Sequence, residues 1–366
     1  MKKLAIIFWF YSACGLVAQD KIDLVFNETT HEFGSIDASE RAVAVFSFVN
    51  VSANPVYIYH IEETYGCSII YYSHRPVLVG ATGTITVQYN HIGNYGEFAK
   101  SIYVKVSNGT DNRTLEFKLT GNILPPATNN KDKFVYRQDG LAFREKGVDM
   151  GAIIKGFVAN KYFEVYNYSS KPIRLDFADV PNFMDIAVEG THTIEPDKTA
   201  KIKVKYNSGK AKYLGKLTSN ILLKINKKNE IKFPIKANIK EDFSSVSVAD
   251  FQNKSEIRVT PDYINLGRIE TGKQYKTKLK IENRGASPLK IHNIIVPVYT
   301  TYSKLKNNTL NSGQSVILEL TIETDKINIL NEKRYISIIS NDFINPILDV
   351  YLQGWSTSSI FTNKKY

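Results

Sequence analysis

The chain of 366 residues has 43% hydrophobic and 23% charged residues, values that are typical of folded globular proteins and exclude a mainly disordered chain. Its length exceeds that of one ordinary hydrophobic core and predicts two or three domains, while 22 Tyr and 19 Phe favour β-strands. The formal net charge of +11 is modest and no dense run of Lys carries it, so we expect no nucleic-acid partner.

The first 18 residues have the pattern of a secretory signal peptide. Lys2 and Lys3 precede an apolar run over residues 4–17, and the small residue Ala18 ends the pattern. The run is short for a membrane span, and no later stretch is apolar over the roughly 18 residues that a span requires. We therefore predict an exported protein without a transmembrane segment, located in the periplasm, at the cell surface or outside the cell.

The two cysteines leave alternatives open. Cys14 follows the small residues of "YSAC" and is the candidate acylated residue of a lipoprotein signal, although we prefer cleavage after Ala18. With that cleavage the exported chain keeps one cysteine, Cys67, so an intramolecular disulfide is impossible. Cys67 is then either a small buried hydrophobic residue, which we favour, or a free thiol that pairs with a partner.

One stretch of sequence occurs three times without a gap. The copies are "FGSIDASERAVAVFSFVNVSANPVYI" (33–58), "MGAIIKGFVANKYFEVYNYSSKPIRL" (150–175) and "LGRIETGKQYKTKLKIENRGASPLKI" (266–291). In every copy a Gly is followed by an Asn and then by a Pro at fixed offsets. This structural repeat motif comprises Gly34, Asn50, Pro55, Gly151, Asn167, Pro172, Gly267, Asn283 and Pro288. A repeat of about 116 residues is typical of immunoglobulin-like domains rather than of a solenoid.

Each motif residue has an expected local role. A Gly within an extended stretch usually marks a β-bulge or a close approach of backbones. The Asn ends an alternating strand and the Pro fixes the start of the next one, so we predict a hairpin across turns such as "NVSANP". Half-buried strands at 85–89, 202–206 and 318–322, followed by a closing strand pair, bring each unit to about seven strands.

The sequence therefore predicts an all-β protein of three tandem immunoglobulin-like β-sandwich domains. We expect the domains at residues 20–123, 130–240 and 256–356. The polar stretches 124–133 and 240–256 are predicted to be linkers, which would give a string of semi-rigid modules.

The first unit resembles a bacterial exported family of unknown function, built from immunoglobulin-like domains of the ASPM and Hydin type (ASH-like), which are similar to the major sperm protein sandwich. The resemblance covers residues 25–123 and is carried by the patterns "FG.I", "F.N....P" and "G..G.I.V.Y"; in the later units only the spacing is shared. It implies the fold and export, and no known reaction. The family usually carries Cys-Gly-Cys in the first domain, where this chain has Tyr65, Gly66 and Cys67, so a redox or metal role for a Cys pair is not expected.

No residues converge in the pattern of a catalytic or cofactor site. The six His are scattered without metal-ligand spacing, and no nucleotide, phosphate or calcium motif is present. One cluster, of His60, Glu62, Glu63, Cys67 and His74, is a candidate nucleophile pair or metal site. The alternative, which we favour, is that His60 and Glu62 share one exposed strand face. We expect no enzymatic activity, no cofactor and no bound metal.

The segment "EETYGCSIIYYSHRP" (62–76) has no counterpart in the later copies and is the predicted interaction loop. Its candidate contact residues are Tyr65, Cys67, Tyr71, Tyr72, His74 and Arg75. Loops and edge strands of sandwich domains suit protein or glycan recognition, and exposed Tyr side chains serve both. We predict a non-enzymatic binding or scaffold protein of the bacterial cell envelope that binds a protein partner. The alternative is a carbohydrate-binding protein that recognises glycans, including acidic ones.

Overall fold

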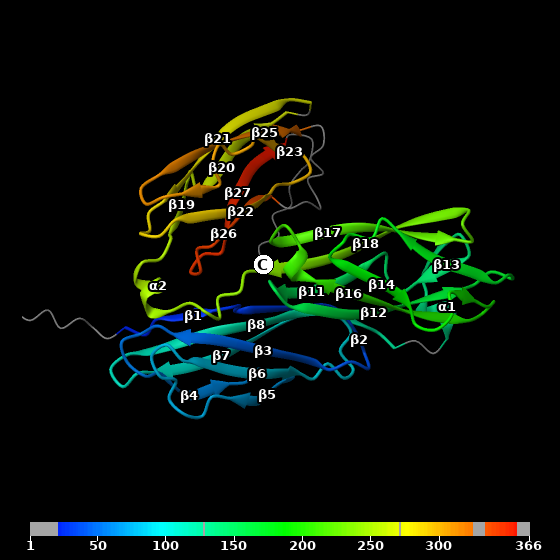
Figure 1. Ribbon diagram of the computed structural model, residues 1–366, viewed down its shortest axis with the longest axis horizontal. Helices are drawn as coiled ribbons and strands as arrows, with labels where there is room; N and C mark the ends of the chain where they lie inside the picture. Colours follow the sequence, from blue (N-terminus) through cyan, green and yellow to red (C-terminus); the bar gives the residue numbers. More distant parts are fainter. Residues whose placement is uncertain (1–20, 127–128, 271, 325–333, 357–366) are drawn as a thin grey trace, which may run out of the picture.

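The computed structural model describes residues 21–126, 129–270, 272–324 and 334–356. The predicted signal peptide (1–18) and Cys14 lie outside the described residues. Six β-sheets form three two-sheet sandwiches, which confirms the predicted all-β fold of three tandem immunoglobulin-like domains (Figure 1).

The first sandwich consists of two four-stranded sheets with the orders β1-β3-β6-β5 and β2-β8-β7-β4. Its strands are β1 (Leu24–Phe26), β2 (Thr30–Asp37), β3 (Ala42–Asn50), β4 (Tyr57–Glu62), β5 (Cys67–Tyr72), β6 (Thr82–Tyr89), β7 (Gly96–Ser107) and β8 (Asn112–Leu124).

The second sandwich consists of two five-stranded sheets with the orders β14-β16-β12-β10-β9 and β11-β18-β17-β13-β15. A short helix, α1 (Asn130–Lys133), precedes it, and a 3-10 turn, η1 (Ser208–Lys210), follows β16. Its strands are β9 (Tyr136–Gln138), β10 (Leu141–Phe143), β11 (Val148–Ile154), β12 (Val158–Asn167), β13 (Ile173–Ala178), β14 (Met184–Val188), β15 (Thr193–Ile194), β16 (Thr199–Asn207), β17 (Gly215–Ile225) and β18 (Asn229–Lys240).

The third sandwich has a four-stranded sheet, β19-β21-β25-β23, and a five-stranded sheet, β20-β27-β26-β22-β24. The helix α2 (Val248–Gln252) lies before it. Its strands are β19 (Ile257–Thr260), β20 (Tyr263–Ile269), β21 (Gln274–Asn283), β22 (Leu289–Ile295), β23 (Thr300–Tyr302), β24 (Thr309–Leu310), β25 (Ser315–Glu323), β26 (Tyr335–Ser340) and β27 (Ile347–Ser356).

Each sandwich has its own hydrophobic core. The buried core residues fall between 22 and 123 in the first, between 141 and 239 in the second and between 257 and 352 in the third. The second core also includes Ile339 of the third sandwich. Strand alternation explains the burial: in β3 the side chains of Ala44, Phe46 and Phe48 point inward and are fully buried, while Val43 and Val45 point outward.

The motif Asn ties the two sheets of every sandwich together. Asn50 is fully buried; its Nδ2 donates to the carbonyl oxygens of Asn54 and Val77, both at 2.9 Å, and its Oδ1 accepts the backbone N–H of Ser52 at 3.0 Å. Asn167 and Asn283 make the same three bonds at the same sequence offsets. The amide thus satisfies two backbone groups of its own turn. It links them to the carbonyl group of a residue that is also paired with the strand after the turn: Val77 pairs with Val56, Ile194 with Ile173 and Leu310 with Leu289.

The predicted hairpin at this turn is wrong. Strand β3 pairs with β1 and β6, whereas β4, which follows Pro55, pairs with β7 in the opposite sheet. The turns before β13 and β22, which contain Pro172 and Pro288, make the same crossing. The chain therefore passes from one sheet to the other, because strand alternation reveals which face is buried but not which strand is the neighbour.

The motif Gly forms a β-bulge in all three sandwiches. Gly34, Gly151 and Gly267 have φ angles of +67°, +72° and +62°. At each of them the parallel pairing of the first long strand with the last strand shifts register. A positive φ is costly for residues with a Cβ, which explains why Gly occupies all three positions.

Two of these bulges pack directly against each other. A Cβ on Gly34 would overlap the carbonyl oxygen of Asp149, and a Cβ on Gly151 would overlap that of Glu32. The first and second sandwiches are therefore in backbone contact, and the Nζ of Lys161 reinforces this contact by donating to the carbonyl oxygens of Phe33 (3.1 Å) and Asp149 (2.6 Å).

The predicted linker 240–256 is a packed connector. Phe243 is buried in a cluster with Val25, Val49 and Val51 of the first sandwich, and its ring lies 6.1 Å from that of Phe343 in the third. The second sandwich also contacts the third, since Asn293 donates to the carbonyl oxygen of Leu214 at 2.9 Å. The three sandwiches thus surround a common junction instead of forming an open string (Figure 1).

Asn167→Ala should lower the free energy of unfolding of the second sandwich by about 3 kcal/mol, because the four hydrogen bonds of the side chain are lost. Amide hydrogen exchange of residues 158–178, measured at a series of urea concentrations, gives the free energy of unfolding of this sandwich alone. Asn160→Ala, at an exposed position of the same strand, should change the value by less than about 0.5 kcal/mol. Equal effects of the two substitutions would contradict the role of the amide.

Gly151→Ala should separate the first two sandwiches, since the new methyl group would overlap backbone atoms. Gly156→Ala is the matched control: its φ is +95° and no described atom lies within 4 Å of its Cβ position. Both changes should cost about 1 kcal/mol in backbone strain. Only Gly151→Ala should increase the radius of gyration in small-angle X-ray scattering; an unchanged radius would argue against the glycine contact.

Candidate functional site

An outward face of the first sandwich carries no charged side chain. In the sheet β1-β3-β6-β5, the residues Val45, Thr86 and Tyr71 lie side by side across three strands, and Val43, Gln88 and Ser68 form the neighbouring row. Val45 is 56% exposed and Tyr71 is 51% exposed. We call this surface the uncharged face; it consists of Val43, Val45, Ser47, Ser68, Tyr71, Thr84, Thr86 and Gln88.

The equivalent faces of the other two sandwiches are charged. In the second, Glu164 lies opposite Lys201, and Asp185 lies opposite Lys205. In the third, Lys278 forms an ion pair with Glu319 at 2.7 Å. The three sandwiches thus differ in the composition of the equivalent sheet face. Only the face of the first sandwich lacks the charged side chains that normally keep a sheet surface hydrated.

The predicted interaction loop divides between this face and its surroundings. Tyr71 belongs to the uncharged face, Tyr65 is 88% exposed at the neighbouring loop, and Arg75 is exposed beyond β5. Tyr72 is half-buried and its ring lies 4.0 Å from that of His74. These residues surround β5, which is the last strand of its sheet and leaves one edge unpaired.

Sequence reasoning missed the β3 and β6 parts of the face. A signal was present: the outward positions that hold Val45 and Thr86 in the first copy hold Tyr162 and Lys203 in the second. A comparison of outward-facing positions between the repeats would have identified them.

Cys67 is not placed for chemistry. It is 5% exposed and packs into the first core, and burial raises the pKa of its thiol. A protonated, enclosed thiol is a poor nucleophile. His60 and Glu62 lie on β4, in the opposite sheet from Cys67, so the sequence cluster is divided between two sheets.

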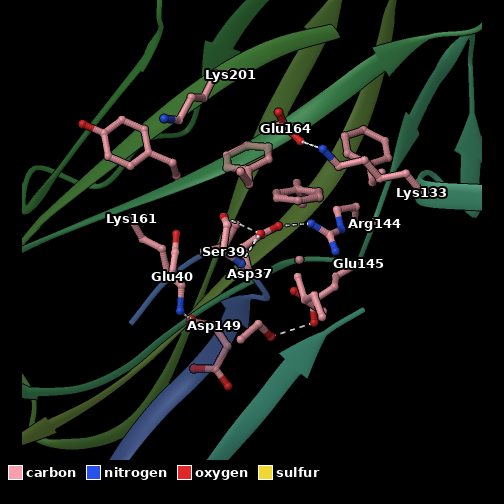
Figure 2. Close-up of a pocket in the computed structure, with 18 residues that line it drawn as sticks. Asp37, Ser39, Glu40, Lys133, Arg144, Glu145, Asp149, Lys161, Glu164 and Lys201 are labelled. Atoms are coloured by element: carbon pink, nitrogen blue, oxygen red, sulfur yellow. Dashed lines mark hydrogen bonds and ion pairs between the residues drawn. The ribbon is translucent and has the colours of Figure 1, made fainter. Parts of the chain in front are cut away.

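A cavity of about 300 Å³ lies between the first and second sandwiches, beside their backbone contact (Figure 2). Its floor is aromatic: the ring of Phe233 lies 5.2 Å from that of Phe143 and 5.0 Å from that of Phe163. Charged side chains surround this floor, including Lys161, Glu145 and Lys201.

The charges of this cavity are largely paired within the protein. Arg144 bonds to Asp37, and Lys133 bonds to Glu164 (Figure 2). Burial alone would raise the pKa of Asp37, but hydrogen bonds from Ser39 and the Arg144 guanidinium outweigh it and hold the pKa below its ordinary value. Burial lowers the pKa of Lys161, whose amine bridges the two sandwiches. The cavity is therefore best described as a gap in a charged interface.

Two features are absent from the residues that the structure describes. No group of three or more His, Cys, Asp and Glu side chains is arranged to hold a metal ion. Among the described helices, none has the length and apolar character needed to cross a membrane.

Two segments match known protein families. Residues 24–123, the first sandwich, match the family described as "Protein of unknown function (DUF1573)". Residues 255–354, the third sandwich, match the "HYDIN/CFA65/VesB-like, Ig-like domain". These matches agree with the expected resemblance to a family of unknown function with immunoglobulin-like domains. A search of curated proteins finds no match to the sequence.

Three similar solved structures have low sequence identity to this chain and TM-scores below 0.5. A protein of unknown function from Porphyromonas gingivalis W83 is 13% identical, with 59% of this chain and 99% of that chain covered and a TM-score of 0.47. The VesB protease of Vibrio cholerae is 8% identical over 28% of this chain and 31% of its own, with a TM-score of 0.23. The endo-fucoidan hydrolase MfFcnA4 is 8% identical over 86% of this chain and 42% of its own, with a TM-score of 0.24.

Cys67 should react with a thiol reagent such as Ellman's reagent at least about a hundredfold more slowly than an exposed cysteine, because reaction requires local opening of the core. Tyr65→Cys in a Cys67→Ala background supplies the exposed reference at a position two residues away. Rapid reaction of native Cys67 would show that the thiol is accessible.

Proposed function

We propose that this chain is a non-enzymatic, exported binding or scaffold protein of the bacterial cell envelope that binds a protein partner through the uncharged face. The observation that carries the proposal is the contrast between this face and the charged faces of the second and third sandwiches. The signal-like sequence at residues 1–18 supports export, and the resemblance to an exported bacterial family supports the same location.

The physical argument concerns desolvation. A protein that covers a charged face must strip water from each charge, and exposed ion pairs return little of that cost. Covering Val45, Thr86 and Tyr71 buries methyl groups and an aromatic ring instead, and it leaves only hydroxyl groups to be hydrogen-bonded. A flat sheet of this composition matches another sheet or an extended segment better than it matches a small molecule.

The edge of this sheet offers a second mode of contact. Among the described strands, β5 pairs only with β6, so its outer backbone groups are not part of a ladder. One of them, the N–H of Ile69, donates to the side chain of Glu63 at 3.0 Å, which blocks part of the edge. We expect the partner to lie mainly on the face, with limited pairing to the remaining edge.

The junction between the sandwiches supports the scaffold role. Backbone contact at the two glycine bulges and the buried Phe243 cluster oppose free rotation of the first sandwich. The uncharged face is therefore presented in a fixed direction relative to the other two sandwiches, which reduces the entropy lost when a partner binds.

Recognition of acidic glycans is the second candidate, and one observation favours it. Lys201, Lys203 and Lys205 alternate along the outer face of β16, and the amine of Lys201 lies 4.2 Å from the ring centre of Tyr162. Such a row suits a linear polymer with regularly spaced negative charges. Binding to a sulfated polysaccharide that disappears in high salt and in a Lys203→Glu variant would favour this function.

The double substitution Val45→Lys and Thr86→Lys should weaken partner capture at least about tenfold, because two charges would have to be desolvated in the complex. The measurement is an affinity pull-down of the tagged protein from envelope extracts, with captured proteins quantified by mass spectrometry. Ile317→Lys is the matched control, since it adds a lysine to the corresponding face of the third sandwich, where Ile317 is 46% exposed. A partner that binds all three proteins equally would contradict the proposed face.

A further inference from the structure

The contact between the first two sandwiches is reciprocal. A Cβ on Gly34 would overlap Asp149, which precedes Gly151 by two residues, and a Cβ on Gly151 would overlap Glu32, which precedes Gly34 by two residues. The glycine of each bulge thus contacts the residue that lies two positions before the glycine of the other bulge. Reciprocity of this kind is the signature of a local two-fold axis, the symmetry that relates the halves of an isologous dimer.

The third sandwich has the same bulge, and no described residue packs on it. Gly267 has a φ of +62°, and no described atom lies within 4 Å of its Cβ position. Its backbone N–H donates to the side chain of Asn265 at 2.9 Å, as that of Gly151 does to the side chain of Asp149 at 2.9 Å. The conformation that the second sandwich uses for docking is therefore already formed in the third.

The surroundings of Gly267 also favour a protein contact. Strand β20 is the outermost strand of its sheet and belongs to the sandwich at the top of the view in Figure 1. Tyr263 and Tyr351 lie opposite each other on β20 and β27 and are 50% and 56% exposed. The charges nearby are mixed, since Glu270 forms an ion pair with Lys273 at 2.7 Å, so two copies would not repel each other at this place.

We infer that β20 is a dimerisation edge at which the Gly267 bulge of one chain packs against the Gly267 bulge of a second copy. The contact within the chain shows what covers such a bulge, namely another bulge related by a two-fold axis. Gly34 and Gly151 cover each other, whereas none of the residues that the structure describes covers Gly267, so the available complement is the Gly267 of another chain.

The dimer contact should be weaker than the internal one, because the lysine is missing. Lys161, ten residues after Gly151, bridges the two strands at the internal contact, whereas the position ten residues after Gly267 is Thr277. The two positions are equivalent in the sheets: Lys161 lies opposite Val204, and Thr277 lies opposite Leu320. Two separate chains also lose the advantage of being covalently joined.

Sedimentation velocity of the chain over a range reaching about 1 mM covers the affinities of weak protein contacts. We expect a monomer–dimer equilibrium that Gly267→Asn weakens at least about tenfold, because Asn tolerates a positive φ but adds atoms at the two-fold axis. Gly313→Asn is the control in the same sandwich: its φ is +75° and its Cβ position is open. It should leave the dimerisation constant within about twofold.

A gain of affinity provides an independent test that does not depend on the folding of a glycine variant. Thr277→Lys should strengthen the dimer, because it restores the lysine that bridges the internal contact. Sedimentation as a monomer over the whole range would overturn the inference, and so would a dimer that Gly267→Asn and Thr277→Lys both leave unchanged.

Discussion

A buried carboxamide at the crossing between sheets that follows β3, β12 and β21 is the interaction on which the three sandwiches depend. Backbone groups of these turns lie outside the ladders, so another group must satisfy them away from water. The Asn side chain supplies two donors and one acceptor within reach of its own turn and of the carbonyl group 27 residues further on. Asp lacks the donors, and Gln would displace them by a methylene group.

The hydrogen bonds of the motif Asn also determine the register of the neighbouring strands. Because the same offsets recur in all three copies, the strands that follow each Asn keep one register, and each motif Gly reaches the same position at the edge of its sheet. Two of those positions then meet in the first and second sandwiches. The same local hydrogen-bonding pattern thus recurs in all three sandwiches. The arrangement of the sandwiches then depends on which of their bulged edge strands pack together.

The fold could be predicted from the sequence to the extent that its causes are local. Strand alternation, the turn chemistry around Asn50 and the need for Gly at a bulge are properties of short segments, and they identified three sandwiches. The hairpin was predicted wrongly because the identity of a neighbouring strand is a long-range property.

The junction and the candidate face could not be fully predicted, because both are formed by residues that are distant in the sequence. Phe243, Val246, Val248 and Phe251 stand in a polar stretch that has the composition of a linker, and their role appears only when Phe343 is brought beside them. In the candidate face, Tyr71 was identified because its segment has no later counterpart. Val45 and Thr86 were missed because each is an ordinary strand residue and only their alignment across three strands makes a surface.

The parallel pairing of the first long strand with the last strand, β2 with β8, β11 with β18 and β20 with β27, has a mechanical consequence. When such a domain is pulled by its two ends, the paired strands are loaded along their length in opposite directions. Their hydrogen bonds then bear the force together and must break nearly at once, whereas an antiparallel pair pulled from one end opens bond by bond. A chain of this construction resists extension under tension, which suits the proposed scaffold role.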